Sequence, residues 1–250
     1  IIRIDDVYPE ALVAAGIVKN IRLIKVLRLL FRGFYPLATR IIVLGSDMKD
    51  VLSSCNNSIV VIPNWGETES VVLETKKENV LIKKYSLENK FVILLAGTIG
   101  YVQGIDTVVE TAEALKNNDQ IRFLIVGSGS KEEWLKNQIK QRDLTNIILA
   151  GQFSKSNQNT FLNACDVALV ALKPQMYGLG VPSRFYNYAA AGKPIVAVLD
   201  GNSEISNVIK RNDIGRIVSP GNPFELKSTL IELSEMDEAT LLGMGEKARQ

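Results

Sequence analysis

Residues 91–110 read FVILLAGTIGYVQGIDTVVE, an apolar run that passes through glycines into a helical pattern. Five more short apolar runs follow along the chain, at 121–126, 147–150, 167–172, 194–199 and 215–218. Each run is bounded by Gly, Pro or Asp and does not alternate with polar residues. Such runs are typical of strands that are buried on both faces of a parallel sheet.

Helical patterns separate these runs and cover residues 106–117, 131–142, 157–165, 184–191, 203–210 and 223–235. Strict alternation of strand and helix with short connections is typical of a doubly wound sheet. We therefore predict an α/β fold with a doubly wound, parallel, Rossmann-like sheet.

The residues before this stretch predict a second, partial unit. Residues 1–64 contain an opening apolar run and two more, at 40–44 and 59–63, whereas residues 65–90 are polar and charged. This shift in composition predicts a partial Rossmann-like unit over 1–64, a linker over 65–90 and the main domain over 91–250. Because the chain opens without Met and inside a strand pattern, we expect it to be a fragment of a longer protein.

Composition narrows the classes of function. The 29 basic and 27 acidic residues almost balance, so nothing indicates a nucleic-acid partner. His is absent, which excludes His-based triads, His-ligated zinc and imidazole bases within this chain. Cys55 and Cys165 lie far apart and form neither a disulfide framework nor a CxxC metal site, which fits a reducing compartment.

Glycines follow four successive predicted strands, at the sheet edge where ligands of such folds bind. Glycine lets backbone amides approach a phosphate closely, although it also serves tight turns after a strand. The candidate binding residues at these strand ends are Gly97, Thr98, Gly100, Gln103, Gly127, Gly129, Gly151, Gln152, Phe153, Gly178 and Gly180. A dinucleotide fingerprint is not complete, because Glu132 stands where its third glycine would be.

Pro182, Ser183 and Arg184 stand at the start of a predicted helix. Ser183 is suited to an N-cap, and Pro182 restrains the entry of the chain. Arg184 lies in the first turn, where a cation opposes the helix dipole. A diphosphate bound between Arg184 and the helix amides would account for this cation, and pairing with a surface carboxylate is the alternative.

Residues 19–40 contain six basic residues and no acidic ones. Within this stretch, residues 20–31 have a helical pattern, and basic residues recur every three or four positions up to Arg32, which places them on one face of the helix. This basic face indicates either a contact with anionic lipid or a solvated helix surface.

The order of the motifs resembles that of a known enzyme family. The motifs are DVYPE at 6–10, VIPNW at 61–65, AGTIGYVQG at 96–104, IVGSG at 125–129, VPSR at 181–184, YAAAGKP at 188–194 and PGN at 220–222. Together they resemble the retaining GT-B glycosyltransferases of the family 4 type, which act in bacterial envelope and capsular polysaccharide assembly.

The resemblance implies two Rossmann-like domains, of which the second binds a nucleotide-sugar donor and the first an acceptor. It implies that Arg184 is catalytic and binds the diphosphate together with Ser183, and that Asp6 lies on the acceptor side. It places the base near Gly151, Gln152 and Phe153, and the ribose near Asn187. UDP is the favoured carrier and GDP the second choice.

The implied reaction moves a sugar to a hydroxyl of a saccharide or lipid-linked saccharide with retention of configuration. It needs no metal or other cofactor, and it takes place in the cytoplasm or at the inner face of the cytoplasmic membrane. Most of the acceptor domain would precede Ile1, so we expect these 250 residues to bind nucleotide without transferring sugar.

The sequence departs from the family pattern at four positions. Two glutamates of many relatives fall on Leu179 and Asn187, and an Arg and a Lys fall on Thr98 and Gln103. We interpret this as a subfamily difference. A non-catalytic nucleotide-binding module and a sugar-nucleotide epimerase on the same fold are the alternative functions.

Overall fold

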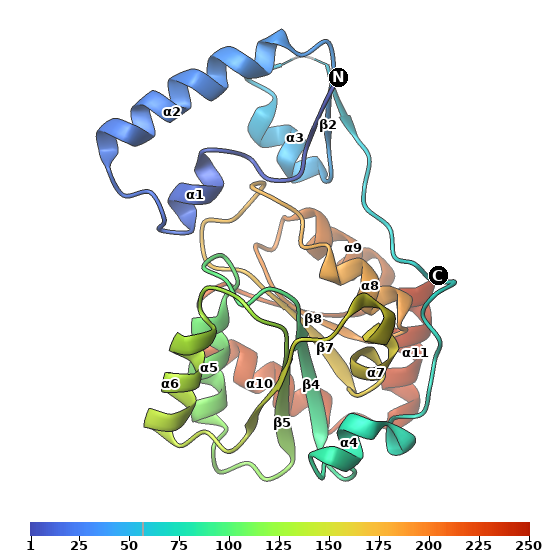
Figure 1. Cartoon of the computed structure of the whole chain (residues 1–250). Helices are drawn as coiled ribbons and strands as arrows, with labels where there is room; N and C mark the ends of the chain where they lie inside the picture. Colours follow the sequence, from blue (N-terminus) through green and yellow to red (C-terminus); the bar gives the residue numbers. More distant parts are fainter. Residues whose placement is uncertain (57) are drawn as a thin grey trace.

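The computed structural model describes residues 1–56 and 58–250, which form two parallel sheets (Figure 1). The second sheet has the strand order β6-β5-β4-β7-β8-β9, and all its pairings are parallel. Its strands are β4 (Phe91–Ala96), β5 (Ile121–Val126), β6 (Ile147–Gly151), β7 (Val167–Ala171), β8 (Ile195–Val198) and β9 (Gly215–Val218). This doubly wound sheet confirms the predicted fold class, and β4 and β7 are its topological switch point.

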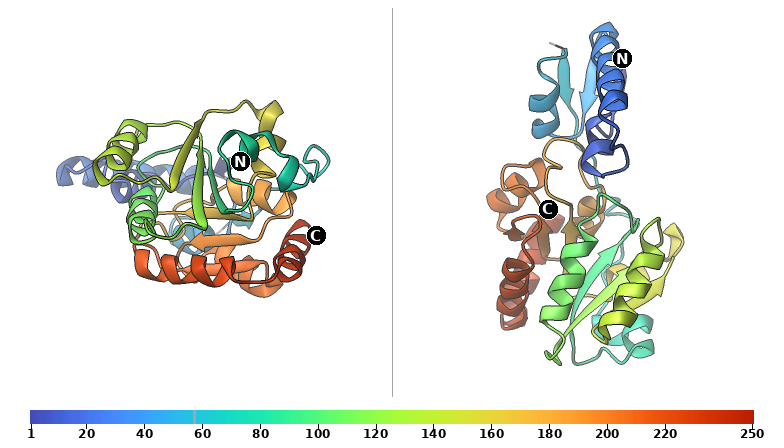
Figure 2. Two further views of the ribbon diagram at one scale, coloured as in Figure 1. Left: turned by 90° about the horizontal axis from the view of Figure 1, so that it is seen from below. Right: turned by 90° about the vertical axis from the view of Figure 1, so that its left-hand side faces the viewer.

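The second sheet is buried on both faces because successive side chains of each strand point to opposite sides. Ile93 and Leu95 of β4 pack into one apolar cluster, whereas Val92, Leu94 and Ala96 pack into another. Helices cover both faces (Figure 2). They are α5 (Ile105–Ala114), α6 (Glu132–Arg142), α7 (Gln158–Leu162), α8 (Arg184–Ala190), α9 (Glu204–Asn212), α10 (Pro223–Ser234) and α11 (Glu238–Arg249), with a 3-10 turn η3 (Lys155–Asn157) before α7.

The first unit is smaller and lies above the carboxyl ends of the second sheet (Figures 1 and 2). Its sheet has the order β1-β2-β3. The elements are β1 (Ile2–Ile4), α1 (Glu10–Ala14), α2 (Ile21–Phe34), η1 (Tyr35–Leu37), β2 (Ile41–Val43), α3 (Ser46–Leu52) and β3 (Ile59–Val61). Buried residues of both units, including Ile4, Val43, Leu179 and Val181, belong to one apolar cluster, so the units share a core at their junction.

Residues 65–90, expected as a linker, pack against the second unit. They contain η2 (Lys76–Glu78) and α4 (Val80–Lys84), and Leu81 and Ile82 are buried. The Asn79 side chain donates to the Thr160 carbonyl at 2.8 Å, and Lys76 pairs with Asp166. These contacts attach residues 76–79 to the second unit.

Helix α11 was not expected, and its glycines explain why. Gly245 lies inside the helix, where glycine is unfavourable. A Cβ there would lie 2.0 Å from the Gly192 carbonyl oxygen, so glycine lets α11 approach the end of α8 closely. No helix within the described part of the chain is long and apolar enough to cross a bilayer.

Candidate functional site

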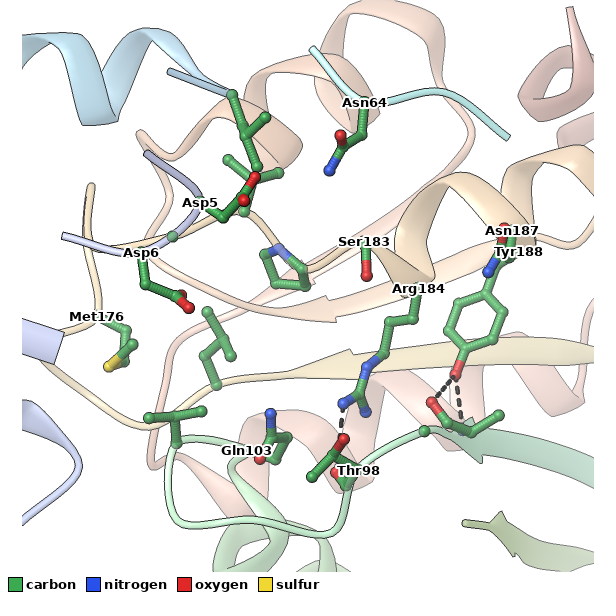
Figure 3. A pocket seen from close by; sticks show the side chains of 18 of the residues that line it. Asp5, Asp6, Asn64, Thr98, Gln103, Met176, Ser183, Arg184, Asn187 and Tyr188 are labelled. Carbon is green, nitrogen blue, oxygen red and sulfur yellow. Dashed lines mark hydrogen bonds between the residues drawn. The ribbon is translucent and has the colours of Figure 1, made fainter. Parts of the chain in front are cut away.

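A cleft of about 610 Å³ lies between the two units, at the carboxyl ends of β4 and β7 (Figure 3). Its walls come from segments far apart in sequence. The candidate residues that line it are Gly97, Thr98, Gln103, Gly180, Pro182, Ser183, Arg184 and Asn187 from the second unit and Asp6 from the first. The structure therefore brings nine of the sequence candidates to one cavity.

Arg184 stands at the first position of α8 and extends toward the loop after β4 (Figure 3). Its guanidinium donates to the Thr98 carbonyl at 3.4 Å, which is long for a hydrogen bond. None of the ion pairs found among the described residues includes Arg184. The alternative of a surface cation paired with a carboxylate is therefore not what the structure shows.

Gly97 makes room for this guanidinium. Its φ of +120° lies in a region that side chains rarely adopt, and a Cβ there would lie 3.4 Å from Cζ of Arg184. The Gly97 amide donates to the Val126 carbonyl, which continues the β4–β5 pairing past the strand end. Glycine at this position thus allows both the turn and the close approach of the cation.

Ser183 does not cap α8, so that expectation was wrong. Its backbone is helical, with φ −61° and ψ −24°, and its side chain makes no cap hydrogen bond. The first turn is instead closed by the amides of Phe185 and Tyr186, which donate to the carbonyls of Pro182 and Ser183. The Ser183 hydroxyl lies on the cleft side, next to Arg184 (Figure 3).

Tyr188 ties α8 to the end of β4. Its buried hydroxyl accepts from the Ala96 amide at 2.7 Å and lies 3.2 Å from the Ala96 carbonyl, to which it donates. Burial raises the pKa of Tyr188 to about 12, so the hydroxyl stays protonated at neutral pH. This contact fixes the height of Arg184 and Asn187 above the strand end, because they stand on the same helix.

The opposite wall comes from the first unit. Arg3 donates to Asp5 and to the Asn64 side chain, both at 2.9 Å. Asp6 forms an isolated bridge with Gly180, where a Cβ would lie 2.6 Å from the Asp6 carboxylate. Burial, and secondly the charge of Asp5, raise the pKa of Asp6 above its ordinary value. The first unit thus presents Arg3, which pairs with Asp5, and the Asp6 carboxylate opposite Arg184.

The other seven candidates do not line this cleft: Gly100, Gly127, Gly129, Gly151, Gln152, Phe153 and Gly178. Cβ atoms on Gly127 and Gly129 would lie 1.9 and 2.4 Å from carbonyl oxygens of the loop after β4. These two glycines therefore allow neighbouring loops to pack closely.

Phe153 stands behind the cleft and packs edge-on against Phe161, with ring centroids 5.9 Å apart. Phe161 and Gln158 line the cleft, although no sequence signal singled them out. Arg3, Asp5 and Asn64 line the cleft as well but were not named as site residues. Arg3 lies within β1, Asp5 directly follows that strand, and Asn64 belongs to the VIPNW motif at 61–65.

Leu179, where the family resemblance implies a glutamate, does not line the cleft. It is 6% exposed and packs into the shared core, where its carbonyl accepts from the Val7 amide at 2.8 Å. Asn187, at the second such position, is exposed at the cleft.

The cleft thus combines a cation, a hydroxyl and a glycine-containing loop on one wall with the Asp6 carboxylate and the Arg3–Asp5 pair on the other. Cations and backbone amides bind phosphates, and carboxylates accept hydrogen bonds from hydroxyl groups. With two Rossmann-like units around the cleft, the chain has the architecture of the GT-B glycosyltransferases.

Residues 77–250 match the glycosyl transferases group 1 family, so the chain belongs to that family. It is 32% identical over 254 residues to the probable glycosyltransferase WbjE of Pseudomonas aeruginosa, and the match covers 100% of this chain and 63% of WbjE. The chain therefore spans less than two thirds of the length of that relative.

Two solved structures show the same fold. HepE of Anabaena in complex with UDP has a TM-score of 0.76 and 15% identity, with 99% of this chain and 66% of HepE covered. WaaG, a glycosyltransferase involved in lipopolysaccharide biosynthesis, has a TM-score of 0.76 and 14% identity, with 99% and 69% covered. At such identities the likeness concerns the fold alone.

Proposed function

We propose that the protein transfers a sugar from a UDP-sugar to a hydroxyl of a saccharide or lipid-linked saccharide in cell-surface polysaccharide biosynthesis. In this proposal it is of the retaining, family 4 type. The observation that supports it most is Arg184, a cation above the loop after β4 that makes no ion pair within residues 1–56 and 58–250, at the switch point of the sheet. The family and the UDP complex of HepE favour the same chemistry.

Charge grows on the diphosphate as the bond to the sugar breaks, and stabilising that charge is the main catalytic requirement. Arg184 and the Ser183 hydroxyl lie side by side at the cleft and would bind the diphosphate oxygens together. The amides of Thr98 and Gly100 would complete this set, because those of Gly97 and Ile99 already donate to the carbonyls of Val126 and Ser128. The proposal therefore assigns the charge stabilisation to these groups and invokes no metal ion.

The nucleoside would extend along α7 and α8. Asn187 would donate to or accept from a ribose hydroxyl, and the base would lie toward residues 151–153, with Phe161 as the apolar wall. UDP is the first choice of carrier and GDP the second.

Asp6 would receive the acceptor hydroxyl from the opposite wall. Its carboxylate lies across the cleft from Arg184 (Figure 3). A carboxylate accepts a hydroxyl hydrogen bond well, and this bond would orient the acceptor oxygen toward the sugar.

Helix α2 supports a peripheral contact with anionic lipid at the inner face of the cytoplasmic membrane. Arg28 pairs with Glu10, whereas Arg22, Lys25 and Arg32 are exposed. Apolar side chains beside them are exposed as well, namely Leu23, Val26, Leu30 and Phe34. This combination of exposed basic and apolar faces favours lipid over a merely solvated surface. Sedimentation with vesicles should show binding that needs anionic lipid and fades with salt.

A nucleotide-binding module without catalysis is the second candidate. It is favoured by the burial of Leu179 and by the amide of Asn187, because neither position supplies the carboxylate that many relatives have there.

Incubation with labelled UDP-sugars and GDP-sugars and an envelope saccharide fraction tests both candidates. Transfer of label to the saccharide supports the proposal. Binding of nucleotide without turnover by these 250 residues alone agrees with both candidates, whereas the same outcome in a longer chain with a complete acceptor domain supports the module. The absence of any nucleotide binding contradicts both.

A further inference from the structure

Helices α3 and α9 belong to different units and begin against each other. The Ser46 amide and hydroxyl, at the start of α3, donate to the Glu204 carboxylate at 2.8 and 2.6 Å. The Glu204 amide, at the start of α9, donates to the Asp47 carboxylate at 3.2 Å. Each helix therefore supplies a carboxylate to the amino-terminal end of the other.

The sequence at the start of α3 suits this exchange. Its N-cap is Gly45, which has no side chain to cap the helix, so the cap comes from Glu204 instead. A Cβ on Gly45 would lie 2.8 Å from Cβ of Glu204, and a larger residue would push the two helices apart. Helix α9 also has its own cap, because Ser203 accepts from the Ser206 amide.

Asp47 is buried to an unusual degree for a carboxylate, with 3% of its surface exposed. Burial raises its pKa, the amides of Glu204 and Met48 oppose that shift, and the charge of Glu204 adds to it. None of the ion pairs among residues 1–56 and 58–250 includes Asp47 or Glu204. The two carboxylates are therefore held by helix amides and by the positive ends of the two helix dipoles.

This contact lies next to the loop that carries one wall of the cleft. A Cβ on Gly178 would lie 2.6 Å from the Asp47 carbonyl oxygen, so the loop rests on the start of α3. Two residues later, Gly180 bridges to Asp6. The same short loop then leads into Arg184. The α3–α9 contact thus holds in place the loop that joins the Asp6 wall of the cleft to the Arg184 wall.

We propose that Asp47 and Glu204 are positioning residues, which hold the two units in the arrangement where Asp6 faces Arg184 across the cleft. They act through residues 178–180, which contact Asp47 and bridge to Asp6, and touch no substrate. The role of the two residues in holding the units together does not depend on the proposed function. Only its consequence for sugar transfer rests on that function.

The direct test measures the distance between the two units. Nitroxide labels are placed on α2 and α6 by Lys25→Cys and Lys140→Cys, both exposed sites, in a Cys55→Ser background. Glu204→Ala removes the cap of α3, and losing a cap shifts an equilibrium about 2- to 30-fold. We expect the distance distribution to broaden in Glu204→Ala and to stay close to the parent in Glu204→Gln, whose amide oxygen still accepts from Ser46.

Glu225→Ala is the matched control. Glu225 also lies in the first turn of a helix, but the hydrogen bonds that its carboxylate accepts among the described residues come from Ser219 and Asn222 of its own unit. An unchanged distribution in Glu204→Ala, or an equal broadening in Glu225→Ala, would overturn the proposal. Asp47→Ala serves as a second variant from the other side of the contact and should broaden the distribution as well.

Ligand binding separates this inference from the proposed function. Arg184 and Ser183 belong to the second unit, so the Kd for UDP should change less than about twofold in Glu204→Ala. Such a change is far smaller than the tenfold change in Kd that corresponds to about 1.4 kcal/mol. In a protein that transfers sugar, kcat/KM for the acceptor should fall while the KM for the donor stays. If the parent protein does not bind UDP, the proposed function is contradicted. The distance measurements then still test whether Asp47 and Glu204 hold the two units together.

Discussion

Replacement of Arg184 by Ala tests the proposed donor site most directly. In the free protein the guanidinium makes one long contact, 3.4 Å to the Thr98 carbonyl, and no ion pair among the described residues. Its removal therefore costs the unliganded protein little. A hydrogen bond to a charged group is worth about 1.5–3 kcal/mol. We expect Arg184→Ala to weaken UDP binding by that amount, which is about 10- to 150-fold in Kd.

Calorimetry with UDP and with uridine measures the effect. Uridine lacks the diphosphate, so its affinity should change by about twofold or less, well within 1 kcal/mol. Arg184→Lys keeps the charge but loses the planar fork, and we expect an intermediate loss. Lys155→Ala is the control for net charge, because Lys155 belongs to the same unit and pairs with Glu67 outside the cleft. Equal losses for UDP and uridine in Arg184→Ala, or an equal loss in Lys155→Ala, would refute the reasoning.

Three further outcomes are expected. Tyr188→Phe leaves the buried Ala96 amide without its acceptor, so the free energy of unfolding in urea should fall by about 1–3 kcal/mol, and an unchanged midpoint would contradict this. Burial raises the pKa of Cys165 and of Tyr188 to about 12, so the folded state holds these two protons more tightly than the unfolded state does. The free energy of unfolding should therefore fall as pH rises from about 9 toward 12. A free energy of unfolding in urea that stays constant from about pH 8 to 11 would count against this. Gly97→Ala forces a side chain to φ +120° and toward the Arg184 guanidinium, so it should cost about 1–3 kcal/mol of stability and weaken UDP binding, whereas unchanged UDP affinity would place the diphosphate elsewhere.

The second sheet could be predicted from the sequence because its strands are buried on both faces. A continuous apolar run such as 91–96 leaves few alternatives to a central parallel strand, and β4 has those bounds in the structure. Expected helices agreed less well at their ends. Helix α2 was expected over 20–31 and covers Ile21–Phe34, because Asn20 caps its start and no breaking signal stops it at Phe31.

The candidate site was predicted in part. Residues that follow strands, such as Gly97 after β4 and Arg184 at the start of the helix after β7, could be found because a parallel sheet places the segments after its strands at one edge. Phe161 and Gln158 could not, because they enter the cleft from a short helix whose orientation depends on packing against α4 and β4. For Ser183 the sequence predicted a capping role that the structure does not show. Its backbone is helical and its hydroxyl lies at the cleft instead.

The sequence by itself determined the doubly wound sheet, the glycines at its strand ends and the cation after the fourth of these strands. Each depends on local chemistry: burial on both faces, backbone freedom, and charge at a helix start. The tertiary structure alone decided that Asp6 faces Arg184 and that Asp47 and Glu204 exchange helix caps. The residues of each pair are far apart in sequence and belong to different units. Periodicity and spacing along the chain predict local structure, but they do not predict how two separate sheets pack against each other.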